Sequence, residues 1–367
     1  MMDLRDRIAA EQAIANFNLP KTQARTPDRL VRLAQALGVY EQNAEIRRCF
    51  DLVCKESSHP GAGWSSLNAD GTPVQFGLSL SKGRSTALEF VGEAFGTSMD
   101  YPARREFGLK RMTRLAQVIG VEFELDAVRQ HLEEVTDGST AGDYEDPAGA
   151  FWIGASFGRD GARSMTIYAN ARRGAEAARW NLLAEFAESV AEGEWPRIFA
   201  IAEAGALKPL GAGVRITAHR SPHARVYFGA YGVRPEEYRR MFREADAGER
   251  FDRALALLFE ELLGGESSFP TRSAVFSFGS NGSGGWSPKL ELCGHCAWSA
   301  DLEAEAHCGK WLQRLGMDAD LYFDVVRILA HDPETSESLL AHAYVGVGMK
   351  HAQPYASIYL NPGRGGL

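Results

Sequence analysis

Apolar and polar residues alternate strictly between Val74 and Leu80. Side chains on a β-strand point alternately to its two faces, so this pattern predicts a strand with one apolar and one polar face. The two faces carry Val74, Phe76, Leu78 and Leu80 and, opposite them, Gln75, Gly77, Ser79 and Ser81. A Lys-Gly-Arg turn at residues 82–84 leads into a second strand that ends near Phe95.

The same strand–turn–strand unit recurs along the chain and alternates with segments of helical periodicity. We predict five strand pairs, over Val74–Phe95, Phe151–Ala169, Val214–Tyr231, Ala274–Trp298 and Ala343–Leu360. Helices are predicted over residues 4–16, 27–55, 103–134, 175–191, 235–263 and 302–329. The repeating unit is therefore an αββα motif.

Ten antiparallel strands joined hairpin by hairpin leave two open edges unless the sheet closes on itself. Closure into a barrel removes both edges, and the amphipathic helices between the hairpins can cover the outside. We therefore predict an α+β fold in one domain over residues 1–367. It is a ten-stranded antiparallel β-barrel built from five αββα repeats, with the helices outside.

The second strands of the later pairs indicate which face lines the barrel. One face is apolar and carries Ile167, Val226, Phe228, Leu290, Leu292, Ile358 and Leu360. The other face is polar, basic and rich in tyrosine. Because the helices must cover an apolar outer face, we expect the polar face to line the lumen. A barrel of ten strands is wide enough to keep a cavity that its side chains do not fill.

Composition and charge narrow the choice of partners. Apolar residues make up 45% of the chain and the formal net charge is −8, so nothing attracts the whole molecule to nucleic acid or anionic lipid. We find no apolar run long enough to cross a bilayer and no signal-peptide pattern, which predicts a cytoplasmic protein. Five cysteines, an odd number, are expected to be reduced.

Taken together, five αββα units around a tyrosine-lined lumen resemble the ABBA-type aromatic prenyltransferases over nearly the whole chain. Residues 70–76, Asp-Gly-Thr-Pro-Val-Gln-Phe, look like the start of the first strand in the dimethylallyltryptophan synthase family, whose bacterial members are the closest match. Residues 353–360, Gln-Pro-Tyr-Ala-Ser-Ile-Tyr-Leu, resemble that family's last strand, and Lys350 stands five residues before Tyr355.

The resemblance implies an enzyme that moves a prenyl group, with dimethylallyl the expected one, from its diphosphate to an aromatic ring by electrophilic substitution. An indole or tryptophan-type small molecule is the expected acceptor. A phenol, a phenazine or a peptide side chain is the alternative. A barrel that binds such molecules without catalysis is a further alternative, although a mere carrier would not need aromatic side chains that shield a cation.

Such a reaction needs cationic groups that converge on the leaving diphosphate. The lumen face offers Arg84, Arg225, Lys289 and Lys350, with His223 as a weaker candidate. By resemblance these match the family's diphosphate-binding positions, except that Thr166 stands where lysine is usual and His223 where arginine is usual. The alternative is that these residues only solvate a wet lumen.

The allylic cation also needs shielding from water, which aromatic faces provide by attracting positive charge. Equivalent lumen positions carry Tyr168, Tyr227, Tyr355 and Tyr359. Tyrosine is a good strand former in its own right, but its recurrence beside basic residues favours a cation shield.

Orientation and deprotonation of the acceptor are predicted to involve Gln75 and Glu291. By resemblance Gln75 stands where the family has a glutamate that accepts the indole N–H bond. An amide oxygen can accept that bond but cannot take a proton. We hypothesise that Glu291 supplies the missing carboxylate, and the competing role for Glu291 is a salt bridge to Lys289 or Arg225.

No cofactor or metal is expected. The chain has no Asp-Asp-x-x-Asp motif, and cationic side chains can replace Mg²⁺ beside a diphosphate. The segment Cys293-Gly-His-Cys296 suggests zinc, but its cysteines would point to opposite faces of a strand. The glycine-rich residues 279–285 lack the Gly-Lys-Ser/Thr ending of a phosphate-binding loop. We therefore expect a prenyl diphosphate and a small aromatic acceptor as partners, no nucleic acid or membrane, and a monomer or homodimer.

Overall fold

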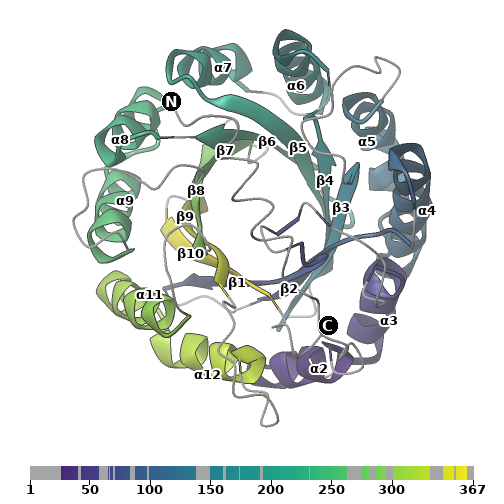
Figure 1. Ribbon diagram of the computed structural model, residues 1–367, viewed down its shortest axis with the longest axis horizontal. Helices are drawn as coiled ribbons and strands as arrows, with labels where there is room; N and C mark the ends of the chain where they lie inside the picture. Colours follow the sequence, from purple (N-terminus) through teal and green to yellow (C-terminus); the bar gives the residue numbers. More distant parts are fainter. Residues whose placement is uncertain are drawn as a thin grey trace.

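The computed structural model describes residues 26–39, 43–57, 65, 67–68, 71–82, 87–96, 99–137, 149–159, 163–172, 174–190, 193–230, 232–262, 274–280, 286–294, 301–330, 342–350 and 353–361. Ten strands close into one barrel at the centre, and a ring of helices surrounds it (Figure 1). This architecture confirms the predicted fold class.

Each strand of the barrel pairs antiparallel with the strands before and after it in the chain, and β10 returns to pair with β1. The strands are β1 (Val74–Ser81), β2 (Ala87–Glu93), β3 (Phe151–Gly158), β4 (Arg163–Asn170), β5 (Lys208–Ile216), β6 (His223–Ala230), β7 (Ala274–Ser280), β8 (Trp286–Cys293), β9 (His342–Lys350) and β10 (Gln353–Leu360). Among these strands no edge is left open.

The helices follow one another around the outside in chain order, and α12 packs beside α2 to complete the ring (Figure 1). They are α2 (Thr26–Ala36), α3 (Asn43–Cys54), α4 (Tyr101–Ile119), α5 (Glu122–Val135), α6 (Glu176–Val190), α7 (Trp195–Ala204), α8 (Pro235–Glu244), α9 (Glu249–Leu262), α11 (Asp301–Leu315) and α12 (Ala319–Ala330). None of the helices in the described ranges is long and apolar enough to cross a membrane.

The apolar face of the strands points outward against the helices, as the alternation predicts. Ile167, Val226, Leu290 and Ile358 each have no solvent-exposed surface and belong to one hydrophobic core with the inner faces of the helices. Burying a side chain of this size contributes about 1.5–3 kcal/mol. The hydrophobic core therefore lies between the sheet and the helices and not in the lumen.

Several element boundaries differ from the sequence-based predictions. β5 begins at Lys208 and not at Val214, because Gly211 and Gly213 interrupt the apolar alternation that marks a strand. Helix α7 was not predicted, and four predicted helices are pairs of shorter ones. In the second pair, α4 ends at Gly120, which adopts the left-handed conformation (φ 79°) that favours glycine. The predicted helix over residues 4–16 lies outside the described residues.

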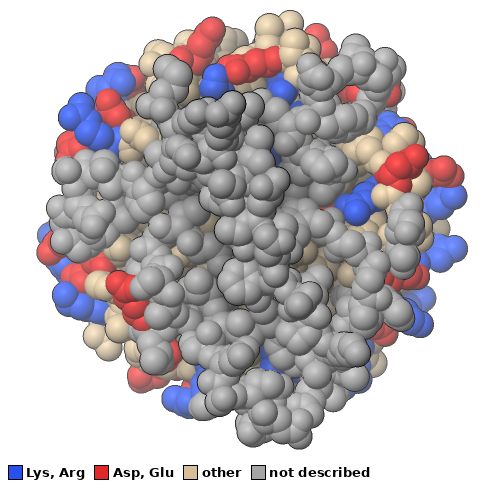
Figure 2. All heavy atoms as spheres, in the orientation of Figure 1, with Lys and Arg blue, Asp and Glu red and all other residues tan. Residues whose placement is uncertain are grey.

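Charged side chains of both signs alternate around the rim of the molecule in the view of Figure 2. Many are neighbours on helices, such as Lys110 with Glu106 and Arg240 with Glu244. Exposed pairs of this kind add less than about 1 kcal/mol each. The charges that bear on function are those inside the barrel.

Candidate active site in the barrel lumen

The lumen has two chemically different parts. Basic side chains gather toward the turns of the β5–β6 and β9–β10 hairpins, and we call them the cation cluster: Arg215, His223, Arg225, Lys289 and Lys350. Toward the opposite ends of the strands, the lumen opens into a pocket lined by aromatic and apolar residues. Strand register places the cluster and the pocket on the same inner face of the sheet.

Arg225 is held by two hydroxyl groups. Its guanidinium donates to Ser277 Oγ at 3.1 Å and to Ser287 Oγ at 2.8 Å, and it lies over Gly279, where a Cβ atom would sit 3.0 Å from Nη2. Among the described residues no carboxylate pairs with Arg225. Its charge is thus oriented and not neutralised, which suits an anion-binding group.

Lys289 and Glu291 form a buried ion pair, with Lys289 Nζ 2.6 Å from Glu291 Oε1. Lys289 also donates to Tyr359 Oη at 3.1 Å and lies 4.8 Å from the centroid of that ring. Burial works against the charged form, but Glu291, Tyr355 and Tyr227 leave the pKa of Lys289 above its ordinary value. The salt bridge that competed with a catalytic role for Glu291 is therefore present, and proton transfer by Glu291 stays a hypothesis.

His223 lies beside the other cations. Its Nδ1 is 3.3 Å from the carbonyl oxygen of Ser280, which can only accept, so Nδ1 carries a proton. Burial and the nearby charges of Arg215, Lys350 and Arg220 lower the pKa of His223, although the Ser280 bond opposes them. A neutral His223 presents Nε2 as an acceptor, and it must gain a proton to donate to an anion.

The predicted tyrosines share the lumen face. The rings of Tyr168 and Tyr227 are in contact, with centroids 5.5 Å apart. Burial raises the pKa of Tyr168, Tyr227 and Tyr359 well above the ordinary value, so these phenols stay neutral. Glycine on a neighbouring strand makes room for three of the rings. A Cβ atom at Gly213 would lie 2.9 Å from Tyr227 and one at Gly77 would lie 3.3 Å from Tyr359, and one at Gly348 would clash with Tyr355.

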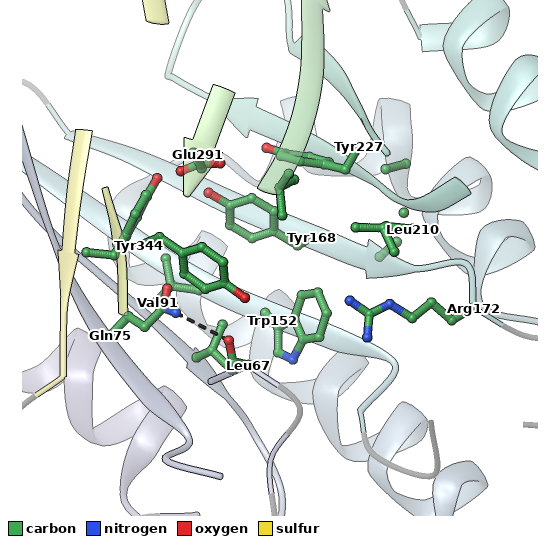
Figure 3. Close-up of a pocket in the computed structure, with 15 residues that line it drawn as sticks. Leu67, Gln75, Val91, Trp152, Tyr168, Arg172, Leu210, Tyr227, Glu291 and Tyr344 are labelled. Atoms are coloured by element: carbon green, nitrogen blue, oxygen red, sulfur yellow. Dashed lines mark hydrogen bonds between the residues drawn. The ribbon is translucent and has the colours of Figure 1, made fainter. Parts of the chain in front are cut away.

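A chain of amides fixes the orientation of Gln75. Asn68 Nδ2 donates to the carbonyl oxygens of Thr72 and Val74, so Asn68 Oδ1 must face the other way. Gln75 Nε2 donates to that Oδ1 at 2.5 Å. It also donates to the carbonyl oxygen of Leu67 at 3.3 Å, the dashed line in Figure 3. Since backbone carbonyls only accept, Gln75 Oε1 is left as an acceptor for another donor.

The pocket has a volume of about 110 Å³ and contains Gln75 in its wall. Figure 3 shows the Glu291 carboxylate and the hydroxyls of Tyr168 and Tyr227 at one end of the view, and Arg172 at the other. The remaining lining includes Leu67, Val91, Trp152, Leu210, Val275, Tyr344 and Tyr359. These side chains suit a flat aromatic molecule with one hydrogen-bond donor.

The described part of the chain brings most of the predicted site residues into one lumen: Gln75, Tyr168, His223, Arg225, Tyr227, Lys289, Glu291, Lys350, Tyr355 and Tyr359. Arg84 lies outside the described residues. Sequence reasoning missed Glu89 and Arg215, which form an ion pair inside the barrel. The alternation of Leu88 and Phe90 with Glu89 could have revealed the first of them.

Comparison with known proteins shows which solved structures share this fold. No protein-family model matches the chain, and no curated protein matches its sequence. Among solved structures, 5-dimethylallyltryptophan synthase from Streptomyces coelicolor matches with a TM-score of 0.77 and 17% identity, over 95% of this chain and 100% of that one. The fold is that of the ABBA-type prenyltransferases. The resemblance inferred from the strand motifs is thus confirmed at the level of the fold.

Two further ABBA structures contain bound molecules. Prenyltransferase PriB, in a ternary complex with L-tryptophan and dimethylallyl thiolodiphosphate, matches with a TM-score of 0.75 and 18% identity, over 92% of this chain and 94% of that one. NotF, in complex with brevianamide F and DMSPP, matches with a TM-score of 0.71 and 17% identity, over 97% and 98%. At such identities the likeness concerns the ABBA fold and not the individual side chains.

Proposed function

We propose that this protein is an aromatic prenyltransferase that moves a dimethylallyl group from its diphosphate to an indole or tryptophan-type acceptor inside the barrel. The observation that carries the proposal is the cation cluster beside a tyrosine-lined pocket within a closed barrel. The ABBA fold supports it, because PriB and 5-dimethylallyltryptophan synthase share that fold.

The proposed reaction begins at the cation cluster. The C–O bond of the donor breaks, and diphosphate leaves with the bonding electron pair. Arg225, Lys289 and Lys350 stabilise the charge that develops on the leaving oxygens, and Arg84 joins them by resemblance. Cationic donors in a water-poor lumen are effective because they are already oriented when the charge appears.

The allylic cation then lies among Tyr168, Tyr227, Tyr355 and Tyr359, whose ring faces attract it by about 0.5–2 kcal/mol each. The acceptor ring attacks the cation and forms the new bond to the prenyl carbon. The ring then loses a proton to a base, for which Glu291 is the candidate. The released proton and the diphosphate are the only other products of the reaction.

The test is direct. Purified protein is incubated with dimethylallyl or geranyl diphosphate and a panel of indoles, phenols and phenazines, and mass spectrometry looks for the added prenyl mass. We expect the prenyl mass on an indole with dimethylallyl diphosphate. Binding of the diphosphate without product from any acceptor would instead indicate a non-catalytic barrel.

Removal of divalent metal is expected to leave the activity within about twofold of the untreated enzyme. Arginine and lysine side chains take the place that Mg²⁺ has beside a diphosphate in carboxylate-based sites. The measurement is the initial rate after dialysis against EDTA, with and without added Mg²⁺. A complete loss of activity that Mg²⁺ restores would contradict this scheme.

Gln75→Met is expected to raise the KM for the acceptor about tenfold, the equivalent of one hydrogen bond of about 1.4 kcal/mol. The KM for the prenyl diphosphate should not change, because Gln75 lies in the pocket and not in the cation cluster. Ser79→Ala, on the same face of β1, is the matched control.

Gln75→Glu provides the complementary measurement. A carboxylate at this position would face the carbonyl oxygen of Leu67 and Asn68 Oδ1, both of which accept and neither of which can donate. We therefore expect slower turnover than in the wild type. Faster turnover with the glutamate would show that the amide chain does not set the orientation of this residue.

A further inference from the structure

We propose that Arg215 is a further residue that binds the diphosphate of the donor, with Glu89 as its counter-ion in the empty barrel. This inference rests on the proposed function and assigns a binding role to the member of the cation cluster that sequence reasoning had not identified. Four features of Arg215 lead to it: its place in the sheet, its ion pair, its open surface and its neighbours.

Arg215 lies on the inner face of β5, between two positions that bear on the donor site. Its register partners are Thr166 on β4 and His223 on β6. Arg215 Nε lies 3.4 Å from Thr166 Oγ1, at the long end of hydrogen-bonding distance. By the family resemblance a lysine is expected at the position of Thr166, and threonine carries no positive charge. The guanidinium of Arg215 places a positive charge beside that position.

Glu89 holds the guanidinium from across the lumen. It lies on β2, three strands away from β5 in the barrel, and both of its carboxylate oxygens are 3.0 Å from Arg215 Nη2. The pair therefore spans the inside of the barrel and does not join adjacent strands. Glu89 is buried and Arg215 is partly exposed, and a pair of this kind contributes little net stability because the buried charge loses its hydration.

These contacts do not occupy every hydrogen-bond donor of Arg215. Its side chain is 40% exposed, whereas that of Glu89 is 6% exposed, and Arg215 stands in the inward-facing row of β5, in register with His223. Among the described residues, its partners engage Nε and Nη2 and leave Nη1 to a ligand. A guanidinium has five N–H donors, so it can keep Glu89 and still bind phosphate oxygens.

The charge of Arg215 belongs electrostatically to the cation cluster. Arg215 and Lys350 both act on the His223 imidazole and help to lower its pKa. The Glu89 carboxylate, against the effect of burial and with help from the tyrosine phenols, raises the pKa of Arg215, so this residue keeps its charge. Arg215 thus adds a permanent positive charge where His223 is neutral.

The experiment measures the affinity of the full chain for inorganic pyrophosphate by titration calorimetry. Arg215→Met alone would leave the Glu89 carboxylate unpaired, and that carboxylate could repel the anion or unfold the protein. The decisive variant is therefore Arg215→Met combined with Glu89→Gln, which removes both charges at once. Arg240→Met, which removes an exposed arginine on α8 that pairs with Glu244, controls for loss of positive charge outside the barrel.

We expect the double variant to bind pyrophosphate at least tenfold more weakly than the wild type, and Arg240→Met to stay within about twofold. The KM for the prenyl diphosphate should rise in parallel, and the KM for the acceptor should not. Wild-type affinity in the double variant would overturn the role of Arg215 while leaving the proposed function in place. If the wild type does not bind pyrophosphate, both proposals fail together.

Discussion

Replacement of Arg225 by methionine is expected to lower kcat/KM for the prenyl diphosphate by at least about 100-fold, the scale of losing one preorganised donor at a developing negative charge. Arg225 is held by the hydroxyls of Ser277 and Ser287, and no carboxylate within the described ranges offsets its charge. It is therefore ready for an anion before the anion arrives. Steady-state kinetics with varied prenyl diphosphate would measure the loss.

Two controls make this prediction specific. Arg240→Met removes an exposed arginine that pairs with Glu244 on α8, and it should leave kcat/KM within about twofold. Arg225→Lys keeps the charge but cannot bond both serine hydroxyls in the same geometry, so an intermediate rate is expected. Wild-type kinetics in Arg225→Met, with the fold intact by circular dichroism, would remove Arg225 from the donor site.

Glu291→Gln is expected to lower kcat about 100-fold or more, the usual contribution of a positioned general base. Glu291 is placed for this role because it lines the pocket, and Figure 3 shows it at the same end as the hydroxyls of Tyr168 and Tyr227. The measurement is kcat across the pH range with saturating substrates. An unchanged rate at every pH would exclude Glu291 as the proton acceptor.

The ion pair with Lys289 predicts a different pattern if it is the only role of Glu291. Loss of the carboxylate would then leave Lys289 buried without its partner. This would lower the stability of the folded protein and the pKa of the Lys289 ammonium group. In that case kcat would fall mainly at high pH, where Lys289 loses its charge, because the pKa of Lys289 is no longer raised by Glu291. The pH profile of kcat therefore distinguishes the two roles in one experiment.

The barrel was predictable from sequence because its outer wall obeys a simple rule. Every second residue of a strand such as Val74–Ser81 packs against helices, so the hydrophobic period reports both the strand and its orientation. The inward direction of residues such as Tyr168 and Arg225 could be predicted because they alternate with outward apolar residues. This alternation gives the direction of a side chain whichever residue stands at the inward position.

Other features depend on contacts that no local pattern records. Gly213 of β5 makes room for the Tyr227 ring, and Gly211 lies against the carbonyl oxygen of Ala169, so this part of the strand lacks the apolar alternation. The pairing of Glu89 with Arg215 joins residues 126 positions apart, and that of Lys289 with Tyr359 joins residues 70 apart. The closure of the barrel decides which cationic side chain contacts which partner. These contacts cannot be predicted from the order of residues along the chain.

The separation between a helix-packed exterior and a chemically active interior has a consequence for protein engineering. Inward positions such as Val91, Trp152 and Val275 touch the pocket, whereas the core that resists unfolding lies on the other side of the sheet. Libraries restricted to these positions should therefore yield altered acceptor preferences at little thermodynamic expense. The same independence accounts for how a scaffold can persist when only 17% of residues coincide.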